Sequence, residues 1–310
     1  MVVVLAGGVG AAKFIEGVVQ VVPPASLTAI VNTGDDFTLH GLTISPDLDI
    51  VTCTLADLID RQQGWGIAGD TTNCMEWLAR LGGPSWFKLG DRDLAIHIRR
   101  TALLRDGHTL SQVADSFRQT FGVAVRILPM SDDPAPTHIF TSDGELHFEE
   151  YFVQRGAQPE VRGVRLHAAG LARPAPGVIA ALASAEVVLV APSNPIVSVG
   201  PILALPGVRE ALRATRAPVV AVSPIVGGAA LKGPAAPLMH ATGHEVSALG
   251  VARAYADILD GIVIDLVDAA LAPAIEALGL RVAVTDTIMR GPVEKAHLAA
   301  TALALALGGS

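Results

Sequence analysis

Residues 1–16 read MVVVLAGGVGAAKFIE. The apolar run from Met1 to Leu5 predicts a short buried strand. Three glycines follow this strand, and Lys13 stands where a helical pattern begins. Glycines let the backbone approach an anion closely, and a helix N-terminus offers free N–H groups and the positive end of its dipole. We therefore predict a strand–turn–helix unit that holds phosphate through Gly7, Gly8 and Gly10.

The glycine turn matches neither of the two common phosphate-binding motifs completely. It is not a Walker A loop, because Ala12 precedes the lysine and Phe14 follows it. Gly8 and Gly10 fit a dinucleotide-binding fingerprint, but Lys13 replaces the third glycine, which normally allows close helix–strand packing. The lysine favours another use of the turn, as a point charge for a second phosphate. A tight turn without a ligand is the alternative.

Composition and charge narrow the class of protein. The chain has 310 residues, 51% of them hydrophobic and only 4% aromatic. This suits one large α/β domain, or two smaller ones, with buried parallel strands. The formal net charge of -8 argues against binding to the backbone of nucleic acid, which needs clustered Lys and Arg.

The cellular compartment of the protein is predicted from its cysteine content and from the length of its apolar runs. Cys53 and Cys74 form no CxxC pair, so we expect no disulfide framework and a reducing cytoplasm. The predicted first strand starts at Val2, so we expect no signal peptide. No uninterrupted apolar run reaches the ~20 residues of a spanning helix. We expect a cytoplasmic protein with no membrane segment.

A second predicted strand, Leu27 to Val31, ends in the turn Asn32-Thr33-Gly34-Asp35-Asp36. Ligands of open parallel sheets bind outside the carboxyl ends of the strands, so this turn should lie beside the glycine turn. Two adjacent carboxylates near phosphate suggest a hard divalent cation. A solvated turn that uses Gly and Asp for conformation explains the same residues equally well.

Residues 45–49, SPDLD, predict a helix start. Ser45 suits the N-cap, Pro46 the first helical position, and two acids the first turn. Asp47 and Asp49 lie two apart and so do not share a helix face. Capping alone explains Asp47.

The middle of the chain breaks the βαβ rhythm. Residues 64–122 look mostly helical, and three predicted strands follow, with a hairpin turn at 142–145. We interpret about 64–175 as a lid-like insertion. Three histidines in it show no metal-ligand spacing, and we expect ordinary surface or core histidines. The strands are Val123–Leu128, Thr137–Thr141 and Leu146–Phe152. The histidines are His138, His147 and His167.

The βαβ rhythm then returns. Strand Glu186–Ala191 precedes Pro192-Ser193-Asn194-Pro195, and strand Pro218–Val222 precedes the loop 223–228. Such polar, glycine-bearing loops can contact a nucleotide or can be simple turns, and their shared position after strands favours function. The last strands are predicted at 261–264 and 280–284, with a helix from Val293. We predict one α/β domain over 1–310, a Rossmann-like three-layer sandwich with a mostly parallel sheet and a helical and hairpin insertion.

Six phrases together resemble one family, the 2-phospho-L-lactate transferases, which make the deazaflavin coenzyme F(420). They span most of the chain in order. The phrases are GGVGAAKF at 7–14, VNTGDD at 31–36, HGLTISPDLD at 40–49, WFKLGDRDLA at 86–95, APSNPIVSVGPIL at 191–203 and SPIVGGAALKG at 223–233.

The resemblance implies a reaction and its partners. The family transfers a phosphorylated three-carbon acid from a guanosine diphosphate-linked donor to the ribityl hydroxyl of 7,8-didemethyl-8-hydroxy-5-deazariboflavin, and GMP leaves. It needs magnesium and forms homodimers. Relatives use phospholactate, phosphoenolpyruvate or another three-carbon phosphate, and the sequence leaves the donor open.

The resemblance also implies roles for particular residues. Asp35 binds magnesium together with Asp36, and either Asp35 or Asp49 orients the attacking hydroxyl or accepts its proton. Asp49 and Lys88 match positions that contact the deazaflavin, although some relatives have Gly in place of Lys88. The remaining expected substrate contacts are Gly7, Gly8, Gly10 and Lys13 on the diphosphate, Ser193, Asn194, Ser223 and Gly227 on the guanosine side, and Asn32 and Thr33.

Two other classes of function stay open at this point. A nicotinamide-dependent oxidoreductase would use Asp35 for the ribose, but Lys13 fits it badly. A nucleotide-sensing protein without transferase activity is the other, because the gluconeogenesis factors share the early glycine and Asn-Thr-Gly-Asp phrases. The later GDRD and SNP phrases favour the transferase.

Overall fold

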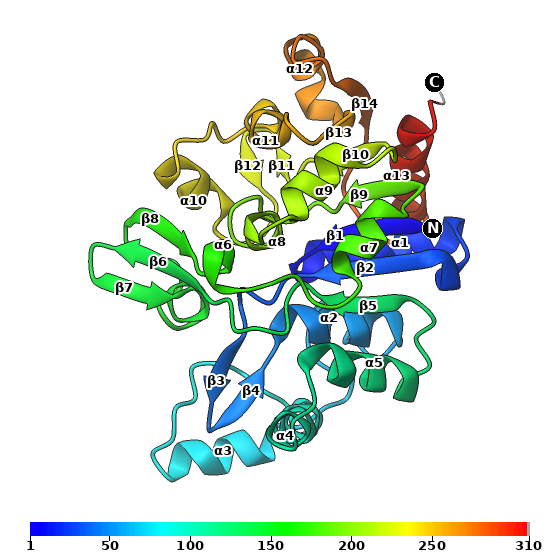
Figure 1. The fold of residues 1–310 in the computed structure, drawn as a ribbon. Helices are drawn as coiled ribbons and strands as arrows, with labels where there is room; N and C mark the ends of the chain where they lie inside the picture. The colour runs from blue at the N-terminus through cyan, green and yellow to red at the C-terminus, as the bar shows by residue number, and fades with distance from the viewer. Residues whose placement is uncertain (309–310) are drawn as a thin grey trace.

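A computed structural model describes residues 1–308. Within that range the centre is a seven-stranded parallel sheet with the order β14-β13-β10-β9-β1-β2-β5 (Figure 1). The fold confirms the predicted α/β class with a Rossmann-like parallel sheet. Its strands are β1 (Val2–Ala6), β2 (Leu27–Val31), β5 (Arg126–Pro129), β9 (Val187–Val190), β10 (Val219–Val222), β13 (Gly261–Asp265) and β14 (Arg281–Thr285).

Strand β1 shows why the sheet is buried on both faces. Val3 and Leu5 pack into one apolar cluster, while Val2, Val4 and Ala6 pack into the other. Side chains alternate between the two faces of a strand, so an uninterrupted apolar run supplies both cores at once.

Helices cover both faces of the sheet and complete the three layers. The helices that contribute to the core on the Val2 face are α1 (Gly8–Val21), α2 (Pro46–Leu55), α5 (Leu110–Thr120) and α13 (Pro292–Ala306). Those that contribute to the core on the Val3 face are α6 (Ala168–Leu171), α7 (Val178–Ala183), α8 (Gly200–Ala204), α9 (Val208–Ala214), α10 (Ala235–Ala241), α11 (Ala248–Tyr255) and α12 (Ala272–Glu276).

Smaller elements surround the sheet. Figure 1 shows α3, α4 and the β3–β4 hairpin gathered on one side of it, and the β6–β8 sheet beyond the ends of its central strands. The predicted insertion at 64–175 includes β5, which pairs with β2 in the central sheet. These elements are β3 (Phe37–Leu39), β4 (Leu42–Ile44), α3 (Asn73–Arg80), α4 (Asp91–Arg105), β6 (Thr137–Thr141), β7 (Gly144–His147), β8 (Val161–Leu166), β11 (Ile225–Val226) and β12 (Ala229–Ala230).

One predicted strand is too long. Strand β7 ends at His147, where 146–152 was expected to stay extended, and a helical turn covers Glu150–Gln154. Phe148 and Tyr151 are both buried and three residues apart, a spacing that a helical turn brings to one face. The turn also buries Glu149, a residue of the candidate site.

The connectivity of the sheet places its ligand-binding edge at β1. The chain leaves β1 for β2 on one side and later returns to β9 on the other side. The carboxyl ends of strands at such a reversal form the crevice in which open α/β sheets bind ligands. Among residues 1–308, none of the helices combines the length and the hydropathy needed to cross a bilayer.

Candidate active site

The glycine turn packs directly against the loop after β9. The Ser193 hydroxyl donates a hydrogen bond to the Gly7 carbonyl over 2.8 Å. A Cβ atom at Gly10 would lie 2.5 Å from the Pro192 carbonyl oxygen, closer than real contacts allow. Glycine is therefore required at this crossing, and the predicted neighbourhood of the first turn and the Ser193 loop is present.

Gly8 begins α1 with a φ of 73°, in the left-handed region that favours glycine. Its N–H donates to Asp47 Oδ1 over 2.8 Å. Farther along the helix, burial lowers the pKa of Lys13, and the nearby charges of Lys232 and Lys295 lower it further. Lys232 follows β12 and Lys295 lies on α13, so two separate elements bring lysines near Lys13.

Asn32 connects the turn after β2 to its surroundings. It is fully buried, and its side-chain amide donates to Asp47 Oδ2 over 2.9 Å and to the Val197 carbonyl over 3.3 Å. Its Oδ1 accepts the Gly34 N–H over 2.8 Å. These contacts bring together the turns after β1, β2 and β9 and the start of α2, as the position of the turns in the sequence predicted.

Asp35 is buried and Asp36 half-buried at the start of the loop after β2. One oxygen of each has no hydrogen-bond partner in the described residues and no contact with solvent. The second oxygen of Asp36 accepts the Ser45 hydroxyl over 2.7 Å. Burial raises the pKa of both carboxyls well above their usual range, and the neighbouring Asp47 adds to the rise for each.

Glu149 completes a cluster of four acids with Asp35, Asp36 and Asp47, which we call the acid cluster; Asp36 is half-buried and the other three are buried. Burial, together with the nearby charges of Asp47 and Asp36, raises the pKa of Glu149 to about 8. Burial likewise raises the pKa of Asp47 to about 6. Carboxylates lie this close together in a stable fold only where bound protons or a cation neutralise their charge.

Asp49 lies outside the acid cluster and already has a cationic partner. The Arg100 side chain is 2% exposed, and both terminal nitrogens of its guanidinium bind Asp49, with Nη1 3.1 Å from Oδ2. His97 Nδ1 lies 3.6 Å from the same oxygen, and burial lowers the pKa of this imidazole to about 4. Asp49 is thus fixed by a buried cationic partner, which suits orientation of a ligand.

Asn194 and Ser223 are engaged within their own loops, whereas Gly227 contacts a distant segment. Asn194 Oδ1 accepts the Ile196 N–H over 2.9 Å, and Ser223 bonds to Ile225 two residues on. The Gly227 N–H donates to Asp268 over 3.0 Å. Thr33, by contrast, is buried with its hydroxyl unpartnered, so it has a free polar atom beside Asn32.

Lys88 is exposed and follows an aromatic group on the lid side of the site. The ring of Phe37 lies 5.5 Å from that of Trp86 and 5.0 Å from that of Phe87, and 5.8 Å from the His147 imidazole. Phe37 comes directly after the Asp35-Asp36 pair, so this aromatic group adjoins the acid cluster along the chain.

Sequence reasoning missed Asp47, Glu149 and Lys232. Asp47 was explained as a helix cap, but its carboxylate accepts from Gly8 and Asn32 instead. Its signal was the neighbouring Asp49, since two acids on different helix faces need separate partners. Glu149 gave no signal, because its burial depends on the helical turn after β7.

The arrangement combines oxygen ligands with an anion-binding turn. Buried, partly unpartnered carboxylates are the donor set that a hard divalent cation such as Mg²⁺ prefers. Gly8, at the start of α1, contacts Asp47 of the same acid cluster. A cation held by the acids could neutralise phosphate oxygens that approach the turn, as phosphoryl transfer requires.

Residues 2–284 match the family described as 2-phospho-L-lactate transferase CofD. The chain belongs to this family. It is therefore a transferase. It is 46% identical to a phosphoenolpyruvate transferase of Streptomyces griseus, over 98% of each chain. It is 43% identical to a 2-phospho-L-lactate transferase of Methanosarcina mazei, over 96% of this chain and 97% of the relative.

The fold of this CofD-family chain also occurs in a more distant protein. A crystal structure of a UPF0052 family protein from Bacillus halodurans superposes with a TM-score of 0.68, covering 97% of this chain and 98% of that one. The two sequences are 17% identical, so the likeness concerns the fold alone.

Proposed function

We propose that the protein transfers a phosphorylated three-carbon acid, 2-phospho-L-lactate or phosphoenolpyruvate, in coenzyme F(420) biosynthesis. The donor is the guanosine diphosphate-linked form of the acid, and the acceptor is the ribityl hydroxyl of 7,8-didemethyl-8-hydroxy-5-deazariboflavin. The hydroxyl oxygen forms a bond to the phosphorus that carries the acid. The phosphoanhydride bond breaks, and GMP leaves.

The observation that carries this proposal is the contact between Gly8 and the acid cluster. The Gly8 N–H reaches Asp47, and Asp47 reaches Asn32, so the turn that suits a diphosphate adjoins the acids that suit a cation. Membership of the transferase family supports the same reading. Lys13, with Lys232 nearby, would add positive charge for the second phosphate.

Asp35, together with Asp36, would hold Mg²⁺, with Asp47 and Glu149 nearby. Bound there, the ion would supply neutralisation of charge on the transferring phosphate. The protein's own part is positioning: Gly8 and the start of α1 hold the diphosphate, and the closed turns exclude water from the acids. Positioning and charge neutralisation dominate phosphoryl transfer.

The acceptor would bind beside Asp49 and the aromatic group of Phe37, Trp86 and Phe87. Aromatic side chains stack well on a planar ring system such as a deazaflavin. Arg100 fixes Asp49 in place, so Asp49 would accept a hydrogen bond from the acceptor. Glu149, whose pKa burial raises to about 8, would receive the hydroxyl proton near neutral pH.

The test is release of GMP. The purified protein is mixed with Mg²⁺, the deazaflavin and each guanylated donor in turn, and nucleotide and deazaflavin products are separated by chromatography. We expect GMP to appear together with a phosphorylated deazaflavin, and Asp35→Asn to reduce both by at least about 100-fold. Bound nucleotide without any product from either donor would instead support a nucleotide sensor.

We also propose that the protein is a homodimer, as the family resemblance implies, and cytoplasmic, as its cysteine usage suggests. Light scattering coupled to size-exclusion chromatography measures the mass directly. A mass near twice 32.0 kDa is expected for the chain. A mass equal to one chain at working concentration would contradict the dimer.

A further inference from the structure

The β6–β8 sheet brings three potential metal ligands to one face. His138 on β6 and Glu145 on β7 are diagonal neighbours, because His138 pairs with His147 and Phe140 pairs with Glu145. His167 follows β8 at the position opposite Pro136 and therefore shares the face of His138. The sequence, in which these histidines show no metal-ligand spacing, gave no sign that His138 and His167 lie close together with Glu145.

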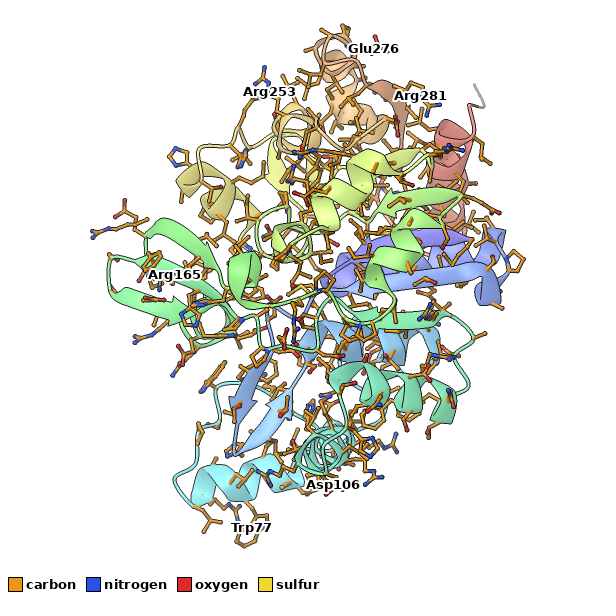
Figure 2. All side chains as sticks on the ribbon, in the orientation of Figure 1. Trp77, Asp106, Arg165, Arg253, Glu276 and Arg281 are labelled. Atoms are coloured by element: carbon orange, nitrogen blue, oxygen red, sulfur yellow. The ribbon has the colours of Figure 1, made fainter. Side chains whose placement is uncertain are left out.

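The side-chain atoms of these three residues meet closely. One nitrogen from each histidine and one Glu145 oxygen all lie within 4.8 Å of one another. His138 Nδ1 is 2.7 Å from Glu145 Oε1, and the two imidazole rings are 4.8 Å apart in a T-shaped arrangement. Figure 2 places Arg165 on the same small sheet, well away from the central strands.

His167 supplies the observation that points to a ligand. Its Nε2 is shielded from solvent and has no hydrogen-bond partner in the described residues, although a neutral or charged ring nitrogen normally finds one. An imidazole nitrogen without a hydrogen-bond partner is available as a metal ligand.

The donor set decides the class of metal. Two imidazoles and one carboxylate suit zinc and the neighbouring divalent transition metals, whereas Mg²⁺ prefers oxygen ligands alone. Three protein ligands leave a fourth position for water. We propose that His138, Glu145 and His167 form a zinc-type site that is distinct from the acid cluster.

Arg165 bears on the strength of this site. Its Nη1 donates to Glu145 Oε1 over 2.8 Å, and its Cζ lies 4.6 Å from the centre of the Phe140 ring. A guanidinium beside a ligand carboxylate opposes a second cation but leaves the other carboxylate oxygen free. The site therefore binds zinc more weakly than a fully dedicated structural site.

Zinc here would join three segments of the small sheet. It would tie β6 and β7, which precede the turn that buries Glu149, to His167, which follows β8. Thr137, beside His138, donates its N–H to the Gly34 carbonyl over 2.7 Å, in the turn that carries Asp35 and Asp36. Binding at the outer sheet would thus stabilise one wall of the acid cluster.

The experiment counts bound zinc. Chelator-treated protein is titrated with Zn²⁺ alone against a chromophoric competitor, and thermal unfolding is followed with and without Zn²⁺. Because the acid cluster can also take Zn²⁺, an Asp35→Asn background isolates the outer site. In the Asp35→Asn protein we expect one equivalent of bound zinc and a higher unfolding temperature with Zn²⁺. Adding His167→Gln to this protein should abolish both.

Matched variants keep the result interpretable. Changing the exposed His108 to Gln should leave the one bound equivalent of zinc unchanged. Glu145→Gln should weaken zinc binding at least tenfold, and circular dichroism would verify that this variant stays folded. Co²⁺ in place of Zn²⁺ should give visible absorption bands that vanish in His167→Gln. Equal zinc binding by the Asp35→Asn protein with and without His167→Gln would overturn the proposal, whatever the transferase assay gives.

Discussion

A single carboxylate, that of Asp47, joins the two halves of the candidate site. It accepts from Gly8 with one oxygen and from Asn32 with the other. Asp47→Asn keeps the shape but sets an amide N–H₂ against the Asn32 amide and removes a charge. We expect transferase turnover to fall roughly 100-fold, or about 2.7 kcal/mol in barrier height, in a steady-state assay of GMP release.

Exposed Asp106 at the end of α4, labelled in Figure 2, gives the matched control. Asp106→Asn should leave turnover within twofold of the parent protein. If Asp47→Asn retained full turnover while folding normally, Asp47 would have no part in the reaction.

The acid cluster also predicts how stability depends on pH. Asp47 has a folded pKa of about 6 and Glu149 of about 8, above the usual ~4 of unfolded carboxyls. The folded chain therefore binds more protons between about pH 4 and 8, so the free energy of unfolding falls as pH rises through that window. Magnesium opposes the fall, because it replaces the protons.

Thermal unfolding with and without Mg²⁺ measures this linkage. At about 100 times its dissociation constant, a ligand adds about 2.7 kcal/mol. We expect the gain in unfolding temperature from Mg²⁺ to be larger near pH 8 than near pH 5.5, and to shrink in Asp47→Asn. An equal gain at both pH values would show that these carboxyls do not bind the ion.

Residue roles could be predicted only where the chemistry is local. The glycine turn and the Asp35-Asp36 pair were visible because their neighbours in sequence are their neighbours in space. Asp47 and Asp49 were not separable, since both suit a helix start. What separates them is Arg100, 51 residues after Asp49, and no local pattern reveals that pairing.

Among the elements, α1 carries the glycine turn and is fixed by its contact with α13. A Cβ atom at Gly17 would lie 2.2 Å from the Lys295 carbonyl oxygen, which is backbone and cannot rotate away. Gly17→Ala gains about 1 kcal/mol of helix propensity, but overpacking costs about 1–3 kcal/mol or more. We expect a net loss of unfolding free energy in urea denaturation, and weaker nucleotide binding.

Gly163→Ala is the companion variant, because its new Cβ meets only the Phe140 ring, at an ordinary 3.6 Å. It should change stability by no more than about 0.5 kcal/mol. A Gly17→Ala protein as stable as the parent would show that the two helices separate freely.

Helices and strands could be predicted where a single hydrophobic period dominates the sequence. Strand Leu27–Val31 was placed with its observed bounds, because its apolar run ends in a clear turn. The predicted strand 146–152 failed after His147, since alternating apolar residues there also fit a helical turn. Burial of Phe148 and Tyr151 against distant segments decides between the two, and that is tertiary information.

At the scale of the whole molecule, the order of the strands creates the site. The reversal at β1 brings together the turns after β1, β2 and β9, and the small sheet of β6–β8 adds Glu149. The parallel class followed from apolar strands that alternate with helices. Strand β5 lies at the edge of the sheet, although it belongs to the predicted insertion. The local sequence could not predict this position, because the order of strands depends on packing.

The central claim is that the anion-binding turn and the acid cluster form one site. Isothermal titration of GDP, a stand-in for the nucleotide part of the donor, with and without Mg²⁺ tests it most directly. Two ligands in one site must show coupling, and the coupling must be reciprocal. We expect Mg²⁺ to tighten GDP binding at least tenfold, and Asp47→Asn to abolish that gain; GDP affinity that is the same with and without Mg²⁺ would contradict the account.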